Sequence, residues 1–542
     1  MTTQNASAET PVKAGFRQTM AWLHTWAGLT LGWLLFFIFA TGTAGYFDTE
    51  IDRWMQPELP PAQIERDAHK TSAVLLEQLR ANAPGADQWL LALPIDRRQP
   101  YARIFWRGAD TGAGASAERD NRLVDLHSGK TLEGRDTGGG LQLYRMHWLL
   151  HYMSRSYSDW IISFATLFMF VGLVTGVIIH KKIFKDFFTF RPKKGQRSWL
   201  DAHNVLSVIT LPFQFMITYS GLIFMGFSFI PLIVAGQYGA DGRGDFYNEV
   251  FSPPGLVEEA GEPAPLIPLA PLIDEAGRHW GEGRIRSIDI RHPGDSNARV
   301  VISEDAADSV AAGAGRLVFD GVSGALLHSA PSASSPAMGV RDVFIGLHEG
   351  LFAPPLMRWL YFLSGLLGAG MVATGLVIWA VKRRQQADRK NGRAPRGLLL
   401  VEKLNVGTVA GLPVAIAAYF WANRLLPVAM PTRAAWEAHA MFLTWLALLV
   451  HAALRPRTRA WREQFALAAL AYAAIPLLNA LTTERHLGQS LAAGDWVFAG
   501  FDLTVLALGI LFGWAAWLAG RKQPAAGRTA PAYPGTALGD AS

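Results

Sequence analysis

The sequence predicts a polytopic α-helical membrane protein with about eight transmembrane helices and two small α+β modules outside the bilayer. Half of its 542 residues are hydrophobic and only 17% are charged, a balance typical of integral membrane proteins. Runs of about 20 apolar residues, each long enough to cross a hydrocarbon core about 30 Å thick, recur along the chain. A unit of span, external module and span also occurs twice, which predicts an internal repeat.

The expected spans are eight apolar runs separated by polar connections. They cover approximately 22–47, 157–180, 203–232, 355–381, 403–424, 435–454, 463–482 and 496–519. The first run follows Lys13 and Arg17, lacks a small-residue cleavage site and continues past the length of a signal peptide. We therefore expect it to be a membrane anchor.

Every second connection between spans is basic, which predicts the orientation of the chain. Lysine and arginine cluster in 181–197, 382–396 and 455–462, and Arg521 and Lys522 follow the last span. The positive-inside rule places these loops and both termini in the cytoplasm. The net charge of +6 is therefore a signal of topology, and we expect no nucleic-acid partner.

Two long connections, 48–145 and 236–345, fall on the opposite side, and each reads as one helix followed by strands. The last hairpin of each turns on an Asp-x-x-Ser-Gly, Asp125 to Gly129 and Asp320 to Gly324, where glycine supplies the positive φ of a tight turn. The expected helices are 72–83 and 271–280, and the expected strand-like runs are 89–96, 101–108, 121–134, 284–292, 298–304 and 316–329. Neither module shows a nucleophile–base constellation or a phosphate loop.

These features divide the chain into eight parts. In order they are a cytoplasmic N-terminus with the first span (1–47), the first module (48–145), spans two and three with their basic loop (146–235), the second module (236–345), span four (346–381), a second basic loop (382–402), an accessory four-span bundle (403–520) and a disordered cytoplasmic tail (521–542).

Spans one and three repeat a spacing between a histidine and a glycine. The interval from His24 to Gly42 equals the interval from His203 to Gly221. Each interval corresponds to about 27 Å of helix, nearly the membrane thickness, and its eighteen steps of 100° return to the same face. Small residues on that face let a neighbouring helix or a flat ligand approach closely.

Spans two and four also correspond to each other. Each runs to a Thr-Gly near its cytoplasmic end, at Thr175 and at Thr374. The interval from His348 to its threonine falls midway between the interval from His147 to Thr175 and the shorter one from His151. The repeat therefore leaves open which of these two histidines corresponds to His348. A parallel repeat of this kind implies a pseudo-two-fold axis along the membrane normal.

The histidines at the ends of these spans are the main candidates for function, because burying an ionisable residue in a bilayer is costly. His24 and His203 lie at the cytoplasmic ends of one related pair of spans. His348 and either His147 or His151 lie at the external ends of the other pair. A single interfacial histidine often bonds only to water or headgroups. Two facing pairs at two depths, however, are what two bis-histidine haems require.

Several assignments of these histidines stay open. His147 and His151 are four residues apart and share a predicted helix face, so one can ligate haem while the other supports it or lies on a substrate or proton path. A zinc site made from both with His348 is an alternative. His180 ends span two where the other unit has Trp379, and it either ligates the inner haem or lies beside it.

The last four spans predict an accessory bundle without a cofactor of its own. His439 and His451 on span six are 12 residues apart, so they are rotated by about 120° and do not share one face. No second histidine-bearing helix is expected to face them. Asp502 lies inside span eight, where a polar contact within the bundle is expected ahead of a role in a proton path. The chain contains no cysteine, which excludes disulfides and Cys-ligated iron–sulfur clusters.

Three stretches, together with the repeated unit, resemble the PepSY-associated transmembrane-helix family over roughly residues 15–385. They are SWLDAHNVLSVITLPFQFMITYSG, IIHKKIFKDFFTFRP and GLHEGLF. The family is often described as iron-regulated inner-membrane proteins, and it includes haem-containing ferric-siderophore reductases of Gram-negative bacteria. The resemblance implies a multi-pass protein of the bacterial inner membrane, with PepSY-like periplasmic modules and two b-type haems. The implied haem ligands are His24, His203, His348 and the His147/His151 site.

We therefore expect an oxidoreductase, a haem-dependent ferric-siderophore reductase that passes electrons across the membrane to a periplasmic Fe(III) chelate. The chain shows no flavin or nicotinamide fingerprint, so the expected electron donor is a quinol or a separate cytoplasmic reductant. One alternative is a non-enzymatic membrane protein whose modules regulate a peptidase or a sensor. The other is a transporter of a metal or a chelate.

Overall fold

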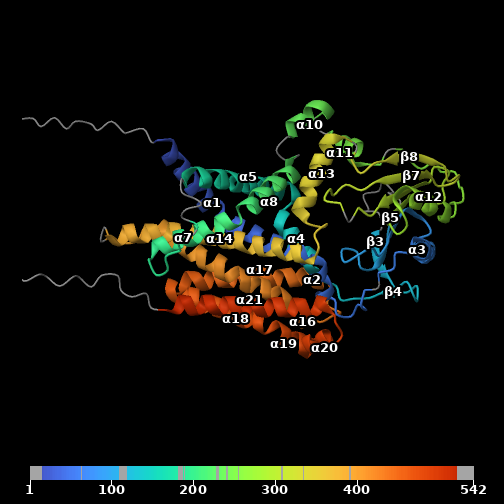
Figure 1. Ribbon diagram of the computed structural model, residues 1–542. Coiled ribbons are helices and arrows are strands. Elements are labelled where there is room, and N and C mark those ends of the chain that lie inside the picture. Colours follow the sequence, from blue (N-terminus) through green and yellow to red (C-terminus); the bar gives the residue numbers. More distant parts are fainter. Residues whose placement is uncertain are drawn as a thin grey trace, which may run out of the picture.

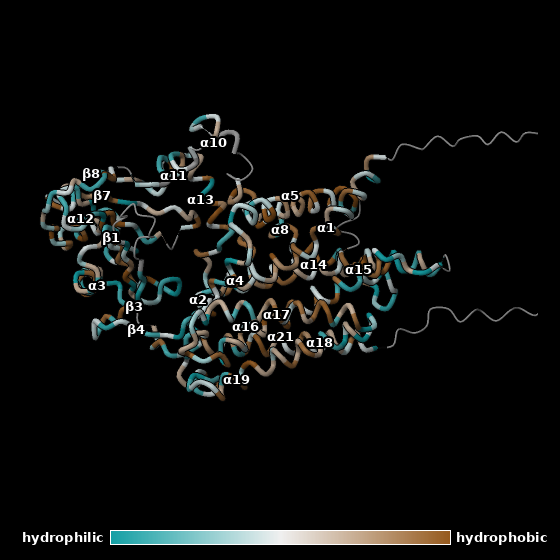
Figure 2. The backbone as a smooth tube through the Cα atoms, turned by 180° about the vertical axis from the view of Figure 1, so that it is seen from behind, coloured by the Kyte–Doolittle hydropathy of each residue, from teal (hydrophilic) through white to brown (hydrophobic). Residues whose placement is uncertain are grey.

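The computed structural model consists of a block of long helices with a β-sheet at one end (Figure 1). It describes residues 15–62, 64–108, 119–180, 187, 190–226, 231–239, 242–253, 255–306, 309–333, 335–389 and 392–521. The expected tail after Arg521 and most of the basic stretch 181–189 lie outside the described residues. Figure 2 shows that the long helices are mainly hydrophobic and that hydrophilic residues are frequent in the part that contains the sheet.

Seven described segments are long and apolar enough to cross a membrane, which confirms the predicted spans at those positions. They are α1 (Phe16–Ala44), which continues through η1 (Gly45–Phe47) into α2 (Asp48–Met55); α5 (Arg155–Ile179); α14 (Pro355–Arg389); α15 (Arg396–Asn405), which continues through the π-helical turn η2 (Val406–Ala410) into α16 (Gly411–Leu425); α17 (Arg433–Leu454); α18 (Arg457–Ala473) with α19 (Ile475–Thr482); and α21 (Trp496–Gly520).

The predicted third span, 203–232, is wrong as a continuous helix. It consists of α7 (Gln196–Ile209) and α8 (Leu211–Phe224), which meet at an angle of 67°. Pro212 lies in the first turn of α8, where its missing N–H and its ring prevent a regular helix from running through the junction. The two pieces count as one span only if the bent pair crosses the membrane together.

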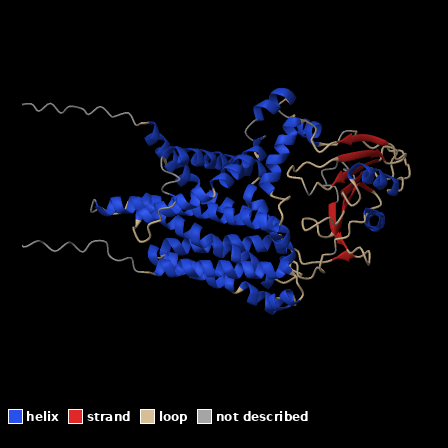
Figure 3. Ribbon diagram, in the orientation of Figure 1, coloured by secondary structure: helices blue, strands red, loops and turns tan. Residues whose placement is uncertain are grey.

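The two expected α+β modules are joined edge to edge, so that their strands form one sheet. The strand order is β4-β3-β2-β1-β5-β6-β7-β8, and every neighbouring pair is antiparallel. The strands are β1 (Ala86–Ala92), β2 (Ala102–Gly108), β3 (Arg119–Val124), β4 (Thr131–Leu132), β5 (Ile285–Arg291), β6 (Arg299–Glu304), β7 (Arg316–Asp320) and β8 (Leu326–Ala330). Strands β1 and β5 join the halves, with Leu90 opposite Asp289, and Figure 3 shows the sheet outside the helical block.

One face of the sheet is covered by two helices, one from each half of the sheet. These helices are α3 (Ala68–Asn82) and α12 (Ala270–Trp280), and Leu75 and Ile273 from them pack with Ile104 and Ile288 in one buried cluster. Burying this apolar face removes it from water and holds both halves together. The predicted turn glycines are confirmed, because Gly129 and Gly324 have φ of 67° and 76°.

Five shorter helices lie between or beside these elements in the described part of the chain, and two of them carry histidines. They are α4 (Gly139–Trp148), α10 (Pro231–Tyr238), α11 (Arg243–Phe251) and α13 (Pro336–Glu349), with α20 (Leu487–Ala492) in the C-terminal part. Helix α4 leads from the sheet back to α5, and α13 leads back to α14, so both connect the sheet to the helical block (Figure 1).

The C-terminal helices pack against α1 and α2 through a buried aromatic cluster. Trp54 on α2 is fully buried and stacks on Phe501 of α21, with 4.1 Å between the ring centres. Phe37 on α1 stacks on Trp445 of α17 at 5.5 Å and 3°. Aromatic pairs of this kind add to the free energy gained by burying their area, so the C-terminal bundle is joined firmly to the remaining helices.

Candidate functional site

The structure brings four of the predicted histidines together as two facing pairs. The ring centres of His24 and His203 are 6.4 Å apart, and those of His147 and His348 are 5.9 Å apart. An imidazole nitrogen lies about 2 Å from a metal that it binds and about 1.2 Å from its own ring centre, so two rings on opposite sides of one metal have centres about 6.4 Å apart. Both pairs therefore have the spacing that a six-coordinate iron needs from its two axial imidazoles.

The inner pair, His24 and His203, is held by two matching sets of hydrogen bonds. Nδ1 of His24 lies 2.9 Å from the carbonyl oxygen of Gly172 and 3.3 Å from the hydroxyl of Thr175. Nδ1 of His203 lies 2.9 Å from the carbonyl oxygen of Met371 and 3.2 Å from the hydroxyl of Thr374. The carbonyl oxygens can only accept, so Nδ1 carries the hydrogen in both rings and Nε2 keeps its lone pair.

The outer pair has the same arrangement with different partners. Nδ1 of His147 donates to the carbonyl oxygen of Ile38 at 3.0 Å, and Nδ1 of His348 lies 2.9 Å from the hydroxyl of Ser220. Burial lowers the pKa of His147, and burial together with the facing imidazole lowers the pKa of His348 to about 3. Both rings are thus neutral at physiological pH, which is the form that binds a metal through Nε2.

Each of these four histidines lies against a glycine. A Cβ added at Gly176 or Gly375 would lie 3.3 Å from Cε1 of His24 or His203, respectively. A Cβ at Gly42 would overlap with the ring of His147, and one at Gly221 would lie 3.4 Å from Cε1 of His348. The glycines that the sequence pairs with His24 and His203 therefore make room for the outer histidines, which explains why their spacing spans the membrane.

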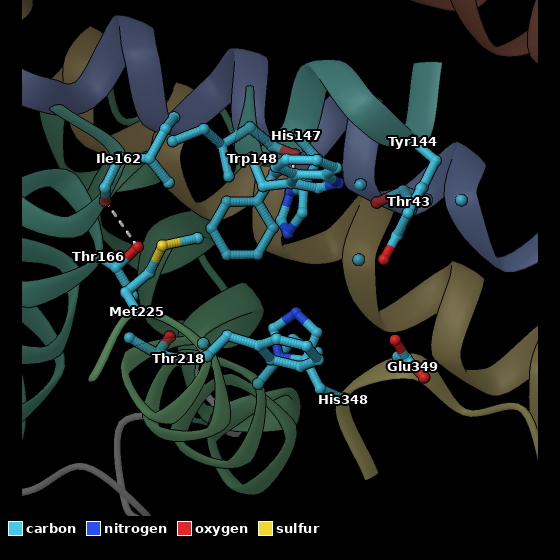
Figure 4. Close-up of a pocket in the computed structure, with 18 of the residues that line it drawn as sticks. Thr43, Tyr144, His147, Trp148, Ile162, Thr166, Thr218, Met225, His348 and Glu349 are labelled. Atoms are coloured by element: carbon cyan, nitrogen blue, oxygen red, sulfur yellow. Dashed lines mark hydrogen bonds between the residues drawn. The ribbon is translucent and has the colours of Figure 1, made fainter. Parts of the chain in front are cut away.

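A cavity of about 530 Å³ opens between the rings of the outer pair. Figure 4 shows His147 from α4 and His348 from α13 pointing toward one another across it. Its walls are mainly apolar, for example Ile162 and Met225, and Tyr144 and Glu349 line another part of it. This volume lies within the range of cofactor sites. The free Nε2 atoms, the spacing of the rings and the glycines beside them fit a flat metal-bearing ring such as haem.

The other candidates for the outer site lie elsewhere. Helix α4 ends at Trp148, so the expectation that His147 and His151 share a helix face is wrong. His151 is turned away and stacks on Phe442 of α17, with 5.3 Å between the ring centres. The chain leaves the helix because Leu149 is already extended, with φ −132° and ψ 106°. Within the described residues no group of three or more His, Cys, Asp or Glu side chains is placed to hold a metal ion, so the zinc alternative is wrong.

His180 lies beside the inner pair. It follows the last residue of α5, and its Nε2 lies 3.1 Å from the side-chain amide nitrogen of Asn204, the residue after His203. Because that amide donates to Nε2 of His180, this nitrogen is already engaged. His180 therefore lies beside the inner pair and contacts Asn204, the residue that follows the candidate ligand His203.

The C-terminal bundle contains polar contacts that the sequence reasoning missed. The ring of His439 on α17 lies 6.5 Å from the ring of His151 between centres. No histidine-bearing helix faces His439 in this contact, as expected, but a histidine from the turn after α4 does. Glu437 is fully buried and pairs with Arg433 at 2.5 Å. An arginine and a glutamate four residues apart in an apolar span were a signal for this pair. Asp502 accepts from the indole N–H of Trp54 at 3.0 Å, which is the expected polar contact within the bundle.

These features define a multi-pass helical membrane protein that carries an antiparallel sheet and paired histidines. The family model described as the PepSY-associated TM region matches residues 21–382, which is 362 of the 542 residues. The chain therefore belongs to this family. The match ends before α15, so the C-terminal bundle lies outside it. No curated protein matches the chain.

Proposed function

We propose that the protein is a di-haem b electron-transfer protein of the bacterial inner membrane, which reduces a ferric siderophore or a similar Fe(III) chelate. The observation that carries this proposal is the pair of facing histidine couples, each with Nδ1 engaged and Nε2 free. A histidine with a purely structural role does not require a second imidazole at the distance that a shared metal would set. A haem iron with two axial imidazoles does require such a pair.

His24 and His203 would hold the inner haem, and His147 and His348 the outer one, and each haem would supply one-electron redox chemistry. The chain's own contribution is to fix the imidazoles: the Nδ1 bonds set the tautomer and the direction of each ring. The two sites lie at different depths, because Ile38, the partner of His147, follows His24 on α1 by 14 residues, or about 21 Å. Two sites at two depths suit electron transfer across a membrane.

The ferric chelate would approach from the side of the sheet. Burial raises the pKa of Glu349, which lines the outer cavity, and the positive charges of Arg286 and Arg98 oppose this shift. Such arginines suit a chelate whose oxygen donors carry negative charge. Reduction of Fe(III) would weaken the chelate, because its oxygen donors prefer the harder ferric ion.

The proposal includes the internal repeat and places the sheet in the periplasm. The matched bonds of His24 to α5 and of His203 to α14 support a parallel repeat, as do the helix and four strands that each half adds to the sheet. The basic residues 382–389 at the end of α14, and Arg521 after α21, lie at the ends of these helices that point away from the sheet (Figure 1), which supports a cytoplasmic position for them.

The test is haem quantification with reduced-minus-oxidised spectra on purified protein. We expect two haems per wild-type chain, one haem in His203→Ala and one haem in His348→Ala, with different spectra remaining in the two variants. His151→Ala is the matched control and keeps both haems. Wild-type protein without a Soret band, or His203→Ala with two haems, would falsify the proposal.

The break between α7 and α8 favours a transporter as a second candidate, because broken helices form substrate sites in transporters. Uptake of a ferric chelate into liposomes without any reductant would support that function. Uptake that depends strictly on reductant would count against it.

A further inference from the structure

We propose that the protein oxidises a lipid-soluble quinol at a site formed by His151, Tyr152 and His439, where the turn after α4 meets α17. The inference rests on the proposed function, because it names the electron donor and the place where its electrons enter. The site joins the family region to the C-terminal bundle: His151 and Tyr152 belong to the first, and His439 belongs to the second.

The three side chains form a stacked aromatic cluster with defined hydrogen bonds. The ring of His151 stacks on Phe442 at 8°, and the ring of Tyr152 stacks on His439 at 10° with 5.6 Å between centres. The Tyr152 hydroxyl shares a hydrogen bond of 2.5 Å with Nδ1 of His439. Gln142 donates from its side-chain amide to Nδ1 of His151 at 3.2 Å, so the Nε2 of His151 carries a hydrogen and can bond to a ligand oxygen.

The cluster lies at an exposed, apolar face of the helical block. His439 lies six residues into α17, about 9 Å from the start of the helix. Trp436 and Leu443, which flank His439 on the same helix face, are 45% and 60% exposed. An ionisable ring within an apolar, outward-facing stripe of a membrane helix is costly unless both of its nitrogens have partners, and Tyr152 provides one for Nδ1 of His439 only. A ligand dissolved in the bilayer reaches this position directly.

The backbone at Tyr152 is strained in a way that holds the cluster together. Its φ is 64°, a left-handed conformation that a bulky aromatic residue rarely adopts. Such a conformation is unfavourable and persists where surrounding contacts impose it, often at functional sites. Here it turns the phenol toward His439 and leaves the side chain 66% exposed.

These groups suit the oxidation of a quinol to a quinone. The aromatic rings offer stacking surfaces for a flat ring, and His439 can accept a quinol proton at Nε2 and release one from Nδ1 to the exposed Tyr152. Oxidation breaks both quinol O–H bonds and yields one quinone, two electrons and two protons. The protons go to external water, the first through His439 and Tyr152, and the two electrons reduce two ferric ions of the chelate to ferrous ions. The Cα atoms of His151 and His147 are at most about 14 Å apart, because only four residues of chain separate them.

The experiment uses the full-length protein in detergent with a short-chain ubiquinol as reductant. The variants are His151→Gln and His439→Gln, and His451→Gln, on the same helix and bonded to Glu463 at 3.0 Å, is the matched control. We expect all variants to keep two haems and to be reduced fully by dithionite. The rate of haem reduction by ubiquinol should fall at least tenfold in His151→Gln and His439→Gln and stay unchanged in His451→Gln.

A second readout does not depend on electron transfer. A photoreactive quinone should label peptides that contain residues 149–154 and 436–443, and the labelling should be lost in His439→Gln and kept in His451→Gln. Wild-type protein whose haems are reduced by dithionite but not by ubiquinol overturns the inference and leaves the proposed function intact, as does a His439→Gln variant with the wild-type rate and labelling. Protein without haem overturns the proposed function and the oxidation step, and the labelling then still shows whether the site binds a quinone.

Discussion

Replacing Gly42 by alanine tests whether His147 holds the outer cofactor. The added Cβ would overlap with the imidazole of His147, and its close neighbours there are three atoms of that ring. Overpacking of this kind costs about 1–3 kcal/mol, and the better helix propensity of alanine returns about 0.5–1 kcal/mol. The net loss of stability is thus at most about 2.5 kcal/mol, and the protein should fold.

The effect on the cofactor should be much larger than the effect on stability. The ring of His147 can avoid the methyl group only by moving, which breaks its bond to the carbonyl of Ile38. A ligand must stay within about 0.5 Å of its working position to bind a metal well. We expect Gly42→Ala to lose one of two haems, measured as haem per chain, with the spectrum of the inner haem unchanged.

Two further substitutions make the test quantitative. Gly221→Ala places its Cβ 3.4 Å from His348, an ordinary contact, and should keep both haems. Gly500→Ala on α21 meets no atom within 4 Å and controls for the substitution itself. If Gly42→Ala binds two haems with unchanged reduction potentials, the assignment of His147 and the reasoning from its packing are both refuted.

Three other predictions concern stability and the tuning of the inner site. Glu437→Ala leaves Arg433 buried without its partner and should cost about 3–5 kcal/mol, seen as a lower midpoint of thermal unfolding, whereas Glu463→Ala at an exposed pair should change it far less. Thr374→Val removes a hydroxyl that lies 3.2 Å from Nδ1 of His203. The imidazole then donates less electron density to the iron, so a potentiometric titration should show a higher reduction potential for the inner haem only. Gly129→Val forces a branched residue to φ 67° and should cost about 1–3 kcal/mol, with faster proteolysis at the β3–β4 hairpin; equal protection from protease would contradict this.

Local features of the chain were readable without the structure. The apolar runs that become α1, α5, α14 and the C-terminal spans follow from their length alone, because a bilayer demands about 20 apolar residues whatever the neighbours are. The turn glycines Gly129 and Gly324 follow from the φ that the hairpin needs. The pairing of His24 with His203 followed from equal spacing to a glycine, since a helix converts sequence distance into position along the membrane.

Tertiary structure alone decided the choices that depend on contacts between distant segments. His147 rather than His151 faces His348, because α4 ends at Trp148 and the chain leaves the helix before it reaches His151. The four-residue spacing of the two histidines does not show where the helix ends, since packing sets that position. The two modules form one sheet because their edge strands β1 and β5 pair with each other. The sequence of an edge strand does not indicate which other strand will pair with it. The meeting of Tyr152 with His439 joins residues 287 positions apart. Hydropathy and turn chemistry are properties of neighbouring residues, whereas facing side chains depend on how whole helices pack, and that packing is settled only in the folded chain.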